Sequence, residues 1–247
     1  MRGIEGRVAV VTGGNTGIGA AIAERLASEG CHVAIAAVED LDGARALADR
    51  LTDGPVACVA AECDVTDAAS IARAFDVVVE ELGPPTVLVN NAGLLTRSPF
   101  AELDAATWDA AIDVSLSGSF RCAQAVVPTM REAGGGAIVN VASELVWLGG
   151  RNLAHYVAAK SGLVGLTRAL ASELGPAGIR VNAAAPGPTD TRMLAPSARE
   201  PAFVRTIPLG RLGAPDDVAG AVAFLCSDDA AWITGQVLGI NGGLVMA

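Results

Sequence analysis

The chain has 247 residues, of which 51% are hydrophobic, 18% are charged and only 4% are aromatic. This composition excludes a disordered or low-complexity chain and predicts a globular core built mainly from Ala, Val, Leu and Ile. The formal net charge of −10 argues against a surface for nucleic acid or anionic membranes, because both need a positive footprint.

Two further features of the sequence bear on location and metal content. No window approaches the roughly 18 to 20 uninterrupted apolar residues that a membrane span requires. Glu5 and Arg7 stand where a signal peptide would have its apolar stretch, so we expect a cytoplasmic protein without membrane association. The five cysteines form no CxxC pair, which predicts free thiols rather than disulfides or a metal site.

Strand-like and helix-like segments alternate along the whole chain. The first unit comprises a strand at 7–12, a helix at 17–29 and a strand at 32–37, because β-branched and apolar runs flank a helical spacing. Further helices are predicted at 41–51, 67–82, 104–132, 153–174 and 214–227, and further strands at 56–61, 86–90, 137–142, 179–184 and 236–240. This order predicts a single α/β domain over 1–247, a Rossmann fold with a doubly wound, seven-stranded parallel sheet and helices on both faces.

A glycine-rich segment, Thr12-Gly13-Gly14-Asn15-Thr16-Gly17-Ile18-Gly19, lies where the first strand turns into the first helix. We interpret it as a pyrophosphate-binding loop, since glycines admit a ligand close to the backbone and the helix N-terminus offers unpaired N–H groups. The alternative is that the glycines only allow the chain to make a tight bend and bind no ligand.

The residues after the second strand bear on the choice of dinucleotide. Glu39 and Asp40 would repel a 2′-phosphate and accept from a ribose hydroxyl, which favours NAD(H). They could equally cap the helix that begins near Leu41.

Three residues farther along form a candidate acid/base set. Tyr156 and Lys160 are four residues apart and therefore share one face of a helix, where an ammonium can lower a phenol pKa from about 10. Ser143 directly follows a predicted strand, at the edge where open α/β sheets bind ligands. A Tyr-x-x-x-Lys pair by itself is usually just a helix surface pair.

As a set, these motifs resemble the short-chain dehydrogenase/reductase family. Its order and spacing are matched by Thr12-Gly13-x-x-x-Gly17-x-Gly19, Asp64-Val65, Asn90-Asn91-Ala92-Gly93, Ser143 thirteen positions before Tyr156, Tyr156-x-x-x-Lys160 and Pro186-Gly187. The segments Gly210-Arg211-Leu212-Gly213 and Asn241-Gly242-Gly243 resemble its 3-oxoacyl-acyl-carrier-protein reductase branch. Many alcohol, polyol and hydroxysteroid dehydrogenases share this sequence pattern.

The resemblance implies an NAD(P)-dependent oxidoreductase that interconverts a ketone or 3-oxoacyl group and a secondary alcohol by hydride transfer. Tyr156 would exchange a proton with the substrate oxygen, Ser143 would hydrogen-bond that oxygen, and Lys160 would also contact the nicotinamide ribose. The implied cofactor-binding residues are Gly13, Asn15, Thr16, Gly17, Ile18, Gly19, Asp64, Val65, Asn90, Ala92, Gly93, Tyr156, Lys160, Pro186, Gly187, Thr189 and Thr191.

Two departures from the family pattern stand out. Ser115, which we include in the catalytic set, occupies the place of a family asparagine that supports a proton-relaying water, so the relay would be weaker or rerouted. Thr16 and Ala37 replace the usual markers of NADP and NAD preference, so the preference for NAD rests on Glu39 and Asp40.

The resemblance also places a substrate pocket under a lid at about 188–209. The pocket residues are Glu144, Leu145, Trp147, Arg151 and His155, each of which could equally be a surface or packing residue. Apolar residues on more than one face of the predicted helices 104–132 and 163–174 indicate an oligomer, and the resemblance implies a homotetramer.

Two other functions stay open at this point. A catalytically weak nucleotide-binding regulator or scaffold is indicated only by Ser115. A lyase or epimerase that uses bound NAD transiently would need more chain after Gly213 than one helix and one strand. In each case we expect a small-molecule ligand, no nucleic acid and no metal.

Overall fold

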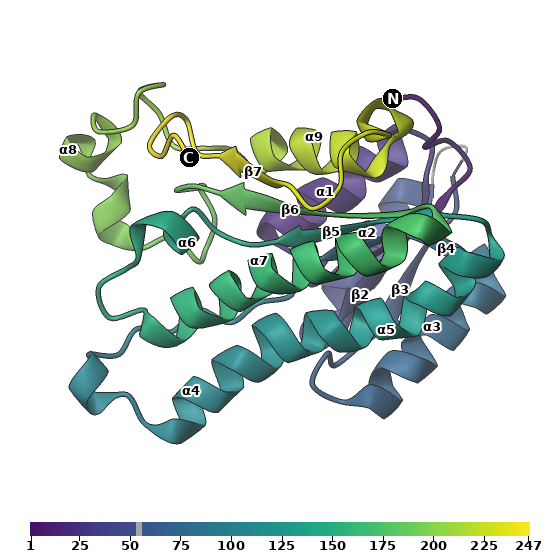
Figure 1. Ribbon diagram of the computed structural model, residues 1–247, viewed down its shortest axis with the longest axis horizontal. Coiled ribbons are helices and arrows are strands. Elements are labelled where there is room, and N and C mark those ends of the chain that lie inside the picture. The colour runs from purple at the N-terminus through teal and green to yellow at the C-terminus, as the bar shows by residue number, and fades with distance from the viewer. Residues whose placement is uncertain (53–55) are drawn as a thin grey trace.

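One parallel sheet organises the protein. The computed structural model describes residues 1–52 and 56–247. Within them, seven strands follow the order β3-β2-β1-β4-β5-β6-β7 (Figure 1). The strands are β1 (Val8–Thr12), β2 (His32–Ala37), β3 (Cys58–Glu62), β4 (Pro85–Asn90), β5 (Gly136–Val141), β6 (Ile179–Pro186) and β7 (Val237–Ile240). The predicted Rossmann-type sheet is confirmed.

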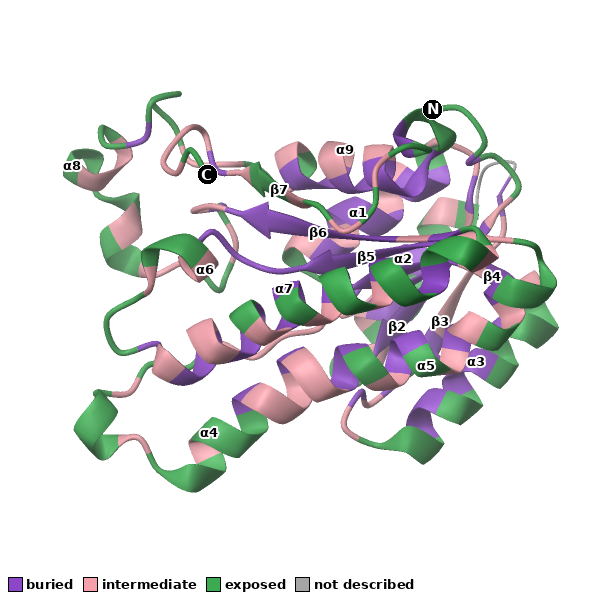
Figure 2. Ribbon diagram, viewed as in Figure 1, coloured by how far each residue is buried: buried purple, intermediate pink, exposed green. Residues whose placement is uncertain are grey.

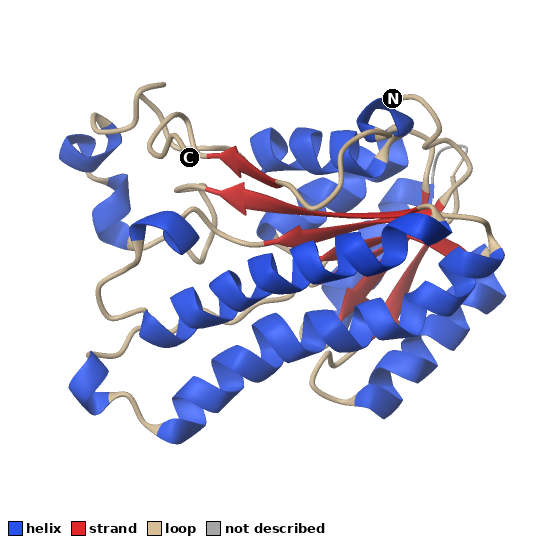
Figure 3. Ribbon diagram, in the orientation of Figure 1, coloured by secondary structure: helices blue, strands red, loops and turns tan. Residues whose placement is uncertain are grey.

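Helices cover both faces of this sheet (Figure 3). They are α1 (Gly17–Ser28), α2 (Leu41–Thr52), α3 (Ala68–Leu82), α4 (Ala105–Ile112), α5 (Gly118–Glu132), α6 (Leu145–Leu148), α7 (Ala154–Leu174), α8 (Pro201–Val204) and α9 (Pro215–Cys226). One apolar cluster joins α1, α2 and α9 to the sheet, and a second joins α3, α5 and α7 to the sheet. Short 3-10 turns lie at Phe100–Glu102, Gly175–Ala177, Pro196–Arg199 and Asp228–Ala230.

The central strands are apolar throughout because both of their faces are covered. All five residues of β1 are buried, and β5 and β6 are buried except for the half-buried Gly136 and Arg180 (Figure 2). Ala9 and Val11 point into one cluster, whereas Val8 and Val10 point into the other. This alternation is the two-residue period of a strand, and it explains why the sequence shows a continuous apolar run.

The structure differs from the sequence prediction at several elements. The predicted helix 104–132 is interrupted by a π-helical turn at Asp113–Ser117, which separates α4 from α5. Helices α6 and α8 were not predicted, because four residues are too few to show helical periodicity. Strand β3 begins at Cys58 rather than Val56, and β6 continues to Pro186, two residues beyond its predicted end.

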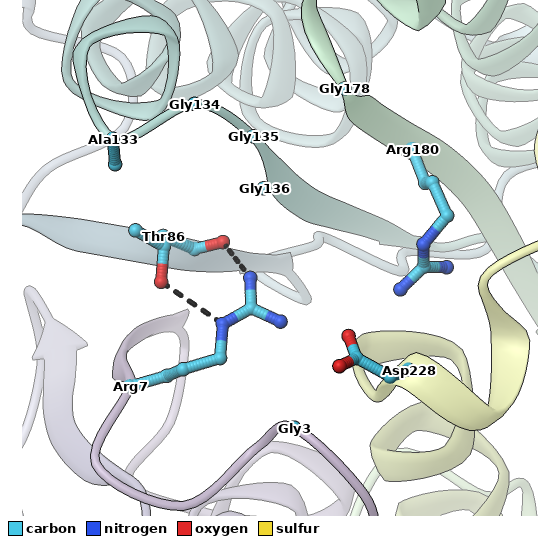
Figure 4. A pocket seen from close by; sticks show the side chains of 10 residues that line it. All are labelled: Gly3, Arg7, Thr86, Ala133, Gly134, Gly135, Gly136, Gly178, Arg180 and Asp228. Carbon is cyan, nitrogen blue, oxygen red and sulfur yellow. Dashed lines mark hydrogen bonds between the residues drawn. The ribbon is translucent and has the colours of Figure 1, made fainter.

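A cavity of about 300 Å³ lies beside the N-terminal ends of β1 and β6, and Figure 4 shows Arg7, Arg180 and Asp228 around it. Arg7 donates to the carbonyl of Cys226 (3.0 Å), and Arg180 donates to the carbonyls of Leu225 (2.8 Å) and Ser227 (2.9 Å). Carbonyls at the end of a helix have no intrahelical partner and carry partial negative charge. The two arginines therefore cap α9, and this explains the cavity as part of the fold.

The capping role of Arg180 predicts a loss of stability on substitution. Arg180→Met removes the guanidinium that donates to the Leu225 and Ser227 carbonyls at the end of α9, so we expect the free energy of unfolding to fall by about 2 kcal/mol. Arg45→Met is the matched control, because the Arg45 side chain is exposed and pairs only with Asp42, and it should change stability by less than about 0.5 kcal/mol. Urea unfolding measures both; equal stability of the two variants would contradict the capping role.

Candidate active site

The first component of the site is the turn between β1 and α1. Gly17 has a φ of 54°, a conformation that residues with a Cβ rarely adopt. A Cβ on Gly19 would lie 2.0 Å from the Gly13 carbonyl oxygen, so only glycine fits there. The turn thereby leads directly into the first N–H groups of α1, at Gly17, Ile18 and Gly19, which have no intrahelical acceptor. Such a turn provides a cradle for an anion.

Hydrogen bonds across two neighbouring strands hold this turn in place. The buried Thr12 hydroxyl accepts from the backbone N–H groups of Asn91 (3.0 Å) and Ala92 (3.1 Å). The Asn91 side-chain amide donates to the carbonyls of Thr12 (3.1 Å) and Gly13 (3.0 Å). Neither Thr12 nor Asn91 was among the predicted site residues. The signal that could have found this pair of hydrogen-bonding residues is the Asn90-Asn91 pair at the end of a buried strand.

The two acids after β2 have different roles. Asp40 has a φ of 52°, and its carboxylate accepts from the Gly43 N–H (3.1 Å), so the helix-cap interpretation is right for Asp40. Glu39 is exposed, and its backbone carbonyl accepts from the Asn15 side chain (2.9 Å), next to the glycine turn. Among the described residues its carboxylate has no ion-pair partner within 4.0 Å. Glu39 is therefore the acid available to a ligand.

Residues after β3 and β4 form the next part of the site. The Asp64 carboxylate accepts from the N–H (2.9 Å) and the hydroxyl (2.7 Å) of Thr66, and these bonds hold its pKa below the usual value. Asp64 thus closes a tight turn after β3, and Val65 is buried beside it. The Asn90 amide donates to Asn140 (2.9 Å), whereas its buried carbonyl oxygen has no partner among the described residues.

Ser143, Tyr156 and Lys160 gather at the carboxyl end of β5, all buried. The Lys160 ammonium donates to the Val141 carbonyl (2.7 Å), and its nitrogen lies 5.9 Å from the centroid of the Tyr156 ring. Gly93 lies against the same ammonium, since a Cβ there would be 3.2 Å from the Lys160 nitrogen. Helix α7 supplies the tyrosine and the lysine, and β5 leads directly into the serine.

Burial dominates the electrostatics of this cluster. It raises the pKa of Tyr156, and a hydrogen bond with Ser143 acts in the opposite direction. It also lowers the pKa of Lys160 to about 8. The sequence predicted a phenol pKa lowered by Lys160; instead the ammonium is turned to a backbone carbonyl, and desolvation of the phenolate prevails.

Ser115 lies in the π-helical turn and is fully buried. Its hydroxyl accepts from the Leu94 N–H (3.2 Å), and its carbonyl accepts from the Ser119 hydroxyl (3.1 Å). No hydrogen bond joins Ser115 to Lys160 within the described part of the chain. The hydroxyl keeps its own proton for a further hydrogen bond.

The segment after β6 closes the site on the other side. Pro186 ends the strand, and the Gly187 N–H donates to the Ile240 carbonyl (2.9 Å). The buried Thr189 hydroxyl donates to the Gly187 carbonyl (3.0 Å). Thr191 lies beside the glycine turn, since a Cβ on Gly17 would be 3.4 Å from its methyl carbon. The structure thus places Thr191 next to the candidate anion cradle.

The five predicted pocket residues fall into two groups. His155 is fully buried, and its Nε2 contacts the hydroxyl of Thr96 (2.9 Å), so it ties the segment after β4 to α7. Arg151 and Trp147 are exposed, and Leu145 is half-buried. Glu144 is buried beside Ser143, and burial raises the pKa of its carboxyl to about 7.

Neither a metal cluster nor a membrane segment is found in the part of the chain that the structure describes. No three or more His, Cys, Asp or Glu residues there are placed to hold a metal ion. None of its helices combines the length and apolar character needed to cross a bilayer.

Titration of the chain's single tyrosine tests the electrostatics of the cluster. Because burial raises the pKa of Tyr156, we expect the phenolate absorbance of the folded protein to appear at higher pH than in denaturant, where the midpoint is about 10. Ser143→Ala should move the midpoint higher still, since the hydrogen bond from Ser143 is lost. Ser172→Ala, on the exposed face of α7, is the control and should leave it in place. A folded midpoint at or below that of the denatured chain would contradict this account.

Comparison with known proteins agrees with this geometry. Residues 13–245 match the family described as enoyl-(acyl carrier protein) reductase. The chain is 43% identical to D-threitol dehydrogenase of Mycolicibacterium smegmatis, over 97% of this chain and 93% of that protein. It is 40% identical to 3-oxoacyl-acyl-carrier-protein reductase of Escherichia coli, over 98% of each chain.

A solved structure gives the same result for the fold. The crystal structure of a Sinorhizobium meliloti protein, assigned as a short-chain alcohol dehydrogenase, superposes with a TM-score of 0.92 at 40% identity, and the match covers 97% of this chain and 96% of that chain. Family members generally use NAD or NADP and act on small molecules. The chain is an oxidoreductase and belongs to the short-chain dehydrogenase/reductase family.

Proposed function

We propose that the protein interconverts a carbonyl group and a secondary alcohol by hydride transfer, with Tyr156 as the general acid/base. The observation that carries this proposal is the cluster at the end of β5, where Ser143, Tyr156 and Lys160 are all buried and the Lys160 nitrogen lies 5.9 Å from the centroid of the Tyr156 ring. A phenol suits the role because it can serve as acid in one direction and base in the other.

The turn after β1 fits a dinucleotide. Its glycines, the start of α1 and the adjacent Thr191 form a cradle for the pyrophosphate, with Asn15 and Thr16 at its rim. The segments around Asp64, Val65, Asn90, Ala92 and Gly93 would hold the adenosine half, and Pro186, Gly187 and Thr189 would border the nicotinamide. When bound, the nicotinamide supplies the hydride for reduction and accepts it in oxidation.

The protein's own residues then handle the proton and the developing charge. Tyr156 gives a proton to the substrate oxygen in reduction and withdraws it in oxidation, while Ser143 hydrogen-bonds that oxygen. The Lys160 ammonium stabilises the phenolate that forms. Ser115 would hold a water through the proton of its hydroxyl, in the place of the family's asparagine, while its oxygen accepts from the Leu94 N–H (3.2 Å).

The relatives support two classes of substrate. One is named for a polyol and the other for a 3-oxoacyl thioester, and both contain a carbonyl or alcohol carbon of the kind that this site serves. Glu144, Leu145, Trp147 and Arg151 would form the substrate wall, and His155 would hold that wall in position.

The proposal extends to assembly and location. We assign residues 188–209 as a lid, which is fastened at its base because Arg199 pairs with Asp190 and donates to the Thr191 carbonyl (2.9 Å). Exposed apolar side chains, including Trp108, Phe120 and Leu238, support a homotetramer, and five free cysteines support the reducing cytoplasm.

Cofactor preference is the first prediction of this proposal. The free carboxylate of Glu39 accepts from a ribose hydroxyl and repels a 2′-phosphate, so NAD(H) should bind at least about tenfold more tightly than NADP(H). Glu39→Gln should narrow this ratio, whereas Asp42→Asn, on the exposed surface of α2, should not. Fluorescence titration with each cofactor measures the ratio; tighter binding of NADPH would overturn the preference.

Removal of the phenol hydroxyl tests the mechanism. Tyr156→Phe should lower kcat by about a hundredfold or more, because general acid/base catalysis is lost. The dissociation constant for the cofactor should stay within about threefold, since the cradle after β1 is untouched. A variant that keeps most of its activity would refute the role of Tyr156. Cofactor binding by the wild-type protein without turnover of any carbonyl or alcohol would favour a regulator instead.

A further inference from the structure

Glu144, which the proposed function places in the substrate wall, carries a buried carboxyl group that takes no part in the proton or hydride transfer. The residue follows Ser143 directly and is only 5% exposed. Its Oε2 atom is buried and has no hydrogen-bond partner among residues 1–52 and 56–247. Buried polar atoms are almost always paired, so an unpaired carboxyl oxygen beside a reacting centre calls for a physical explanation.

The backbone holds Glu144 firmly in this position. Its N–H donates to the Pro186 carbonyl (3.0 Å), and its own carbonyl accepts from the N–H groups of Trp147 (3.0 Å) and Leu148 (3.3 Å). These bonds join the end of β5 to the end of β6 and to the short helix α6. These bonds fix the backbone from which the Glu144 side chain extends.

None of the described neighbours pairs with Oε2 of this carboxyl group. A Cβ on Gly187 would lie 3.0 Å from Oε2, so the carboxyl packs against bare backbone there. The nearby Asn241 side chain is already committed, since its amide donates to the Val245 carbonyl and its oxygen accepts from the Gly243 N–H. Burial raises the pKa of Glu144 to about 7, and no nearby cation opposes this shift.

A structural role does not account for these observations. Other buried polar side chains in the same region, such as Asn140 and Thr167, bond to each other across elements. Glu144 makes no such link, and leaving a buried carboxyl oxygen unpaired costs stability. A ligand that supplies the missing partner would recover that cost on binding.

We infer that Glu144 determines substrate specificity by binding a second hydroxyl group, and that the substrates are vicinal diols or polyols and the corresponding hydroxyketones. The inference rests on the proposed function, because Ser143 and Gly187 flank the reacting centre only in that proposal. Oε2 of Glu144 lies against Gly187, which borders the nicotinamide in that proposal, so a substrate bound through both Ser143 and Glu144 carries its second polar group close to the reacting carbon.

A hydroxyl group matches this carboxyl better than other substituents do. It can donate to the ionised form and accept from the protonated form, so binding tolerates a carboxyl that titrates near neutral pH. An alkyl group would leave the carboxyl desolvated and unpaired, and a substrate carboxylate would be repelled by the ionised form.

The reaction balances without any change at Glu144. In oxidation of a diol, one carbon loses a hydride to the oxidised nicotinamide, and its hydroxyl loses a proton to Tyr156 and then to solvent. The neighbouring hydroxyl keeps its proton and stays bound to Glu144. The product is a hydroxyketone.

The test compares a matched pair of substrates. For the wild-type protein with NAD⁺ or NADP⁺, kcat/KM is measured for butane-2,3-diol and for butan-2-ol, and also for reduction of a 3-oxoacyl thioester. We expect the diol to be preferred over the mono-alcohol by about tenfold or more, because a pocket built to bind a hydroxyl disfavours the analogue that lacks it.

Variants at Glu144 decide whether this preference comes from the carboxyl. In Glu144→Leu the ratio of diol to mono-alcohol kcat/KM should fall by about tenfold, mainly through KM for the diol, whereas Glu144→Gln should retain most of the ratio. Glu144→Ala gives a second measurement if the leucine side chain disrupts folding. Glu173→Leu, on the exposed face of α7, is the control and should leave the ratio unchanged.

The contrary outcomes are distinct. An unchanged ratio in both Glu144→Leu and Glu144→Ala, or a wild-type preference for the mono-alcohol or the thioester, would overturn the inference and leave the proposed function standing. Absence of turnover for every substrate with either cofactor would refute the proposed function and the inference together.

Discussion

The hydrogen bonds between Thr12 and the start of the segment after β4 are the constraint on which the rest of the site depends. Strands β1 and β4 are neighbours in the sheet although three helices and two strands separate them in sequence. Their chains leave the sheet in different directions, which opens a crevice at the carboxyl ends. Thr12 and Asn91 span this crevice at its base and fix the glycine turn relative to Gly93 and Lys160.

Burial, rather than attraction between opposite charges, sets the chemistry of the site. Desolvation favours the uncharged form of three side chains: it raises the pKa of Tyr156 and of Glu144 and lowers the pKa of Lys160. Burial thereby brings the pKa of Glu144 to about 7 and that of Lys160 to about 8, close to neutral pH. The fold builds this environment from small apolar residues, because strands of Val and Ala let α7 lie close to β6 and exclude water from the end of β5.

The main elements could be predicted from the sequence because their patterns are long. Strand β2 lies at the predicted residues, and α7 differs from its prediction by one residue. The site residues themselves come from motif spacing, which the fold turns into proximity. What the sequence could not supply depends on local geometry: the positive φ of Asp40 decides that this acid caps a helix while Glu39 stays free. The direction of the Lys160 side chain is likewise a tertiary result.

The number of residues in the π-helical turn at Asp113–Ser117 sets the orientation of α4. A π turn contains one residue more than the corresponding α turn, so it shifts the phase of everything that precedes it relative to α5. Loss of a single residue there would restore ordinary helical hydrogen bonding and would rotate α4 about its axis by roughly one residue step, about 100°. Because α4 packs on α7, the helix that carries the tyrosine, the site tolerates changes of side chain in this turn more readily than changes of length.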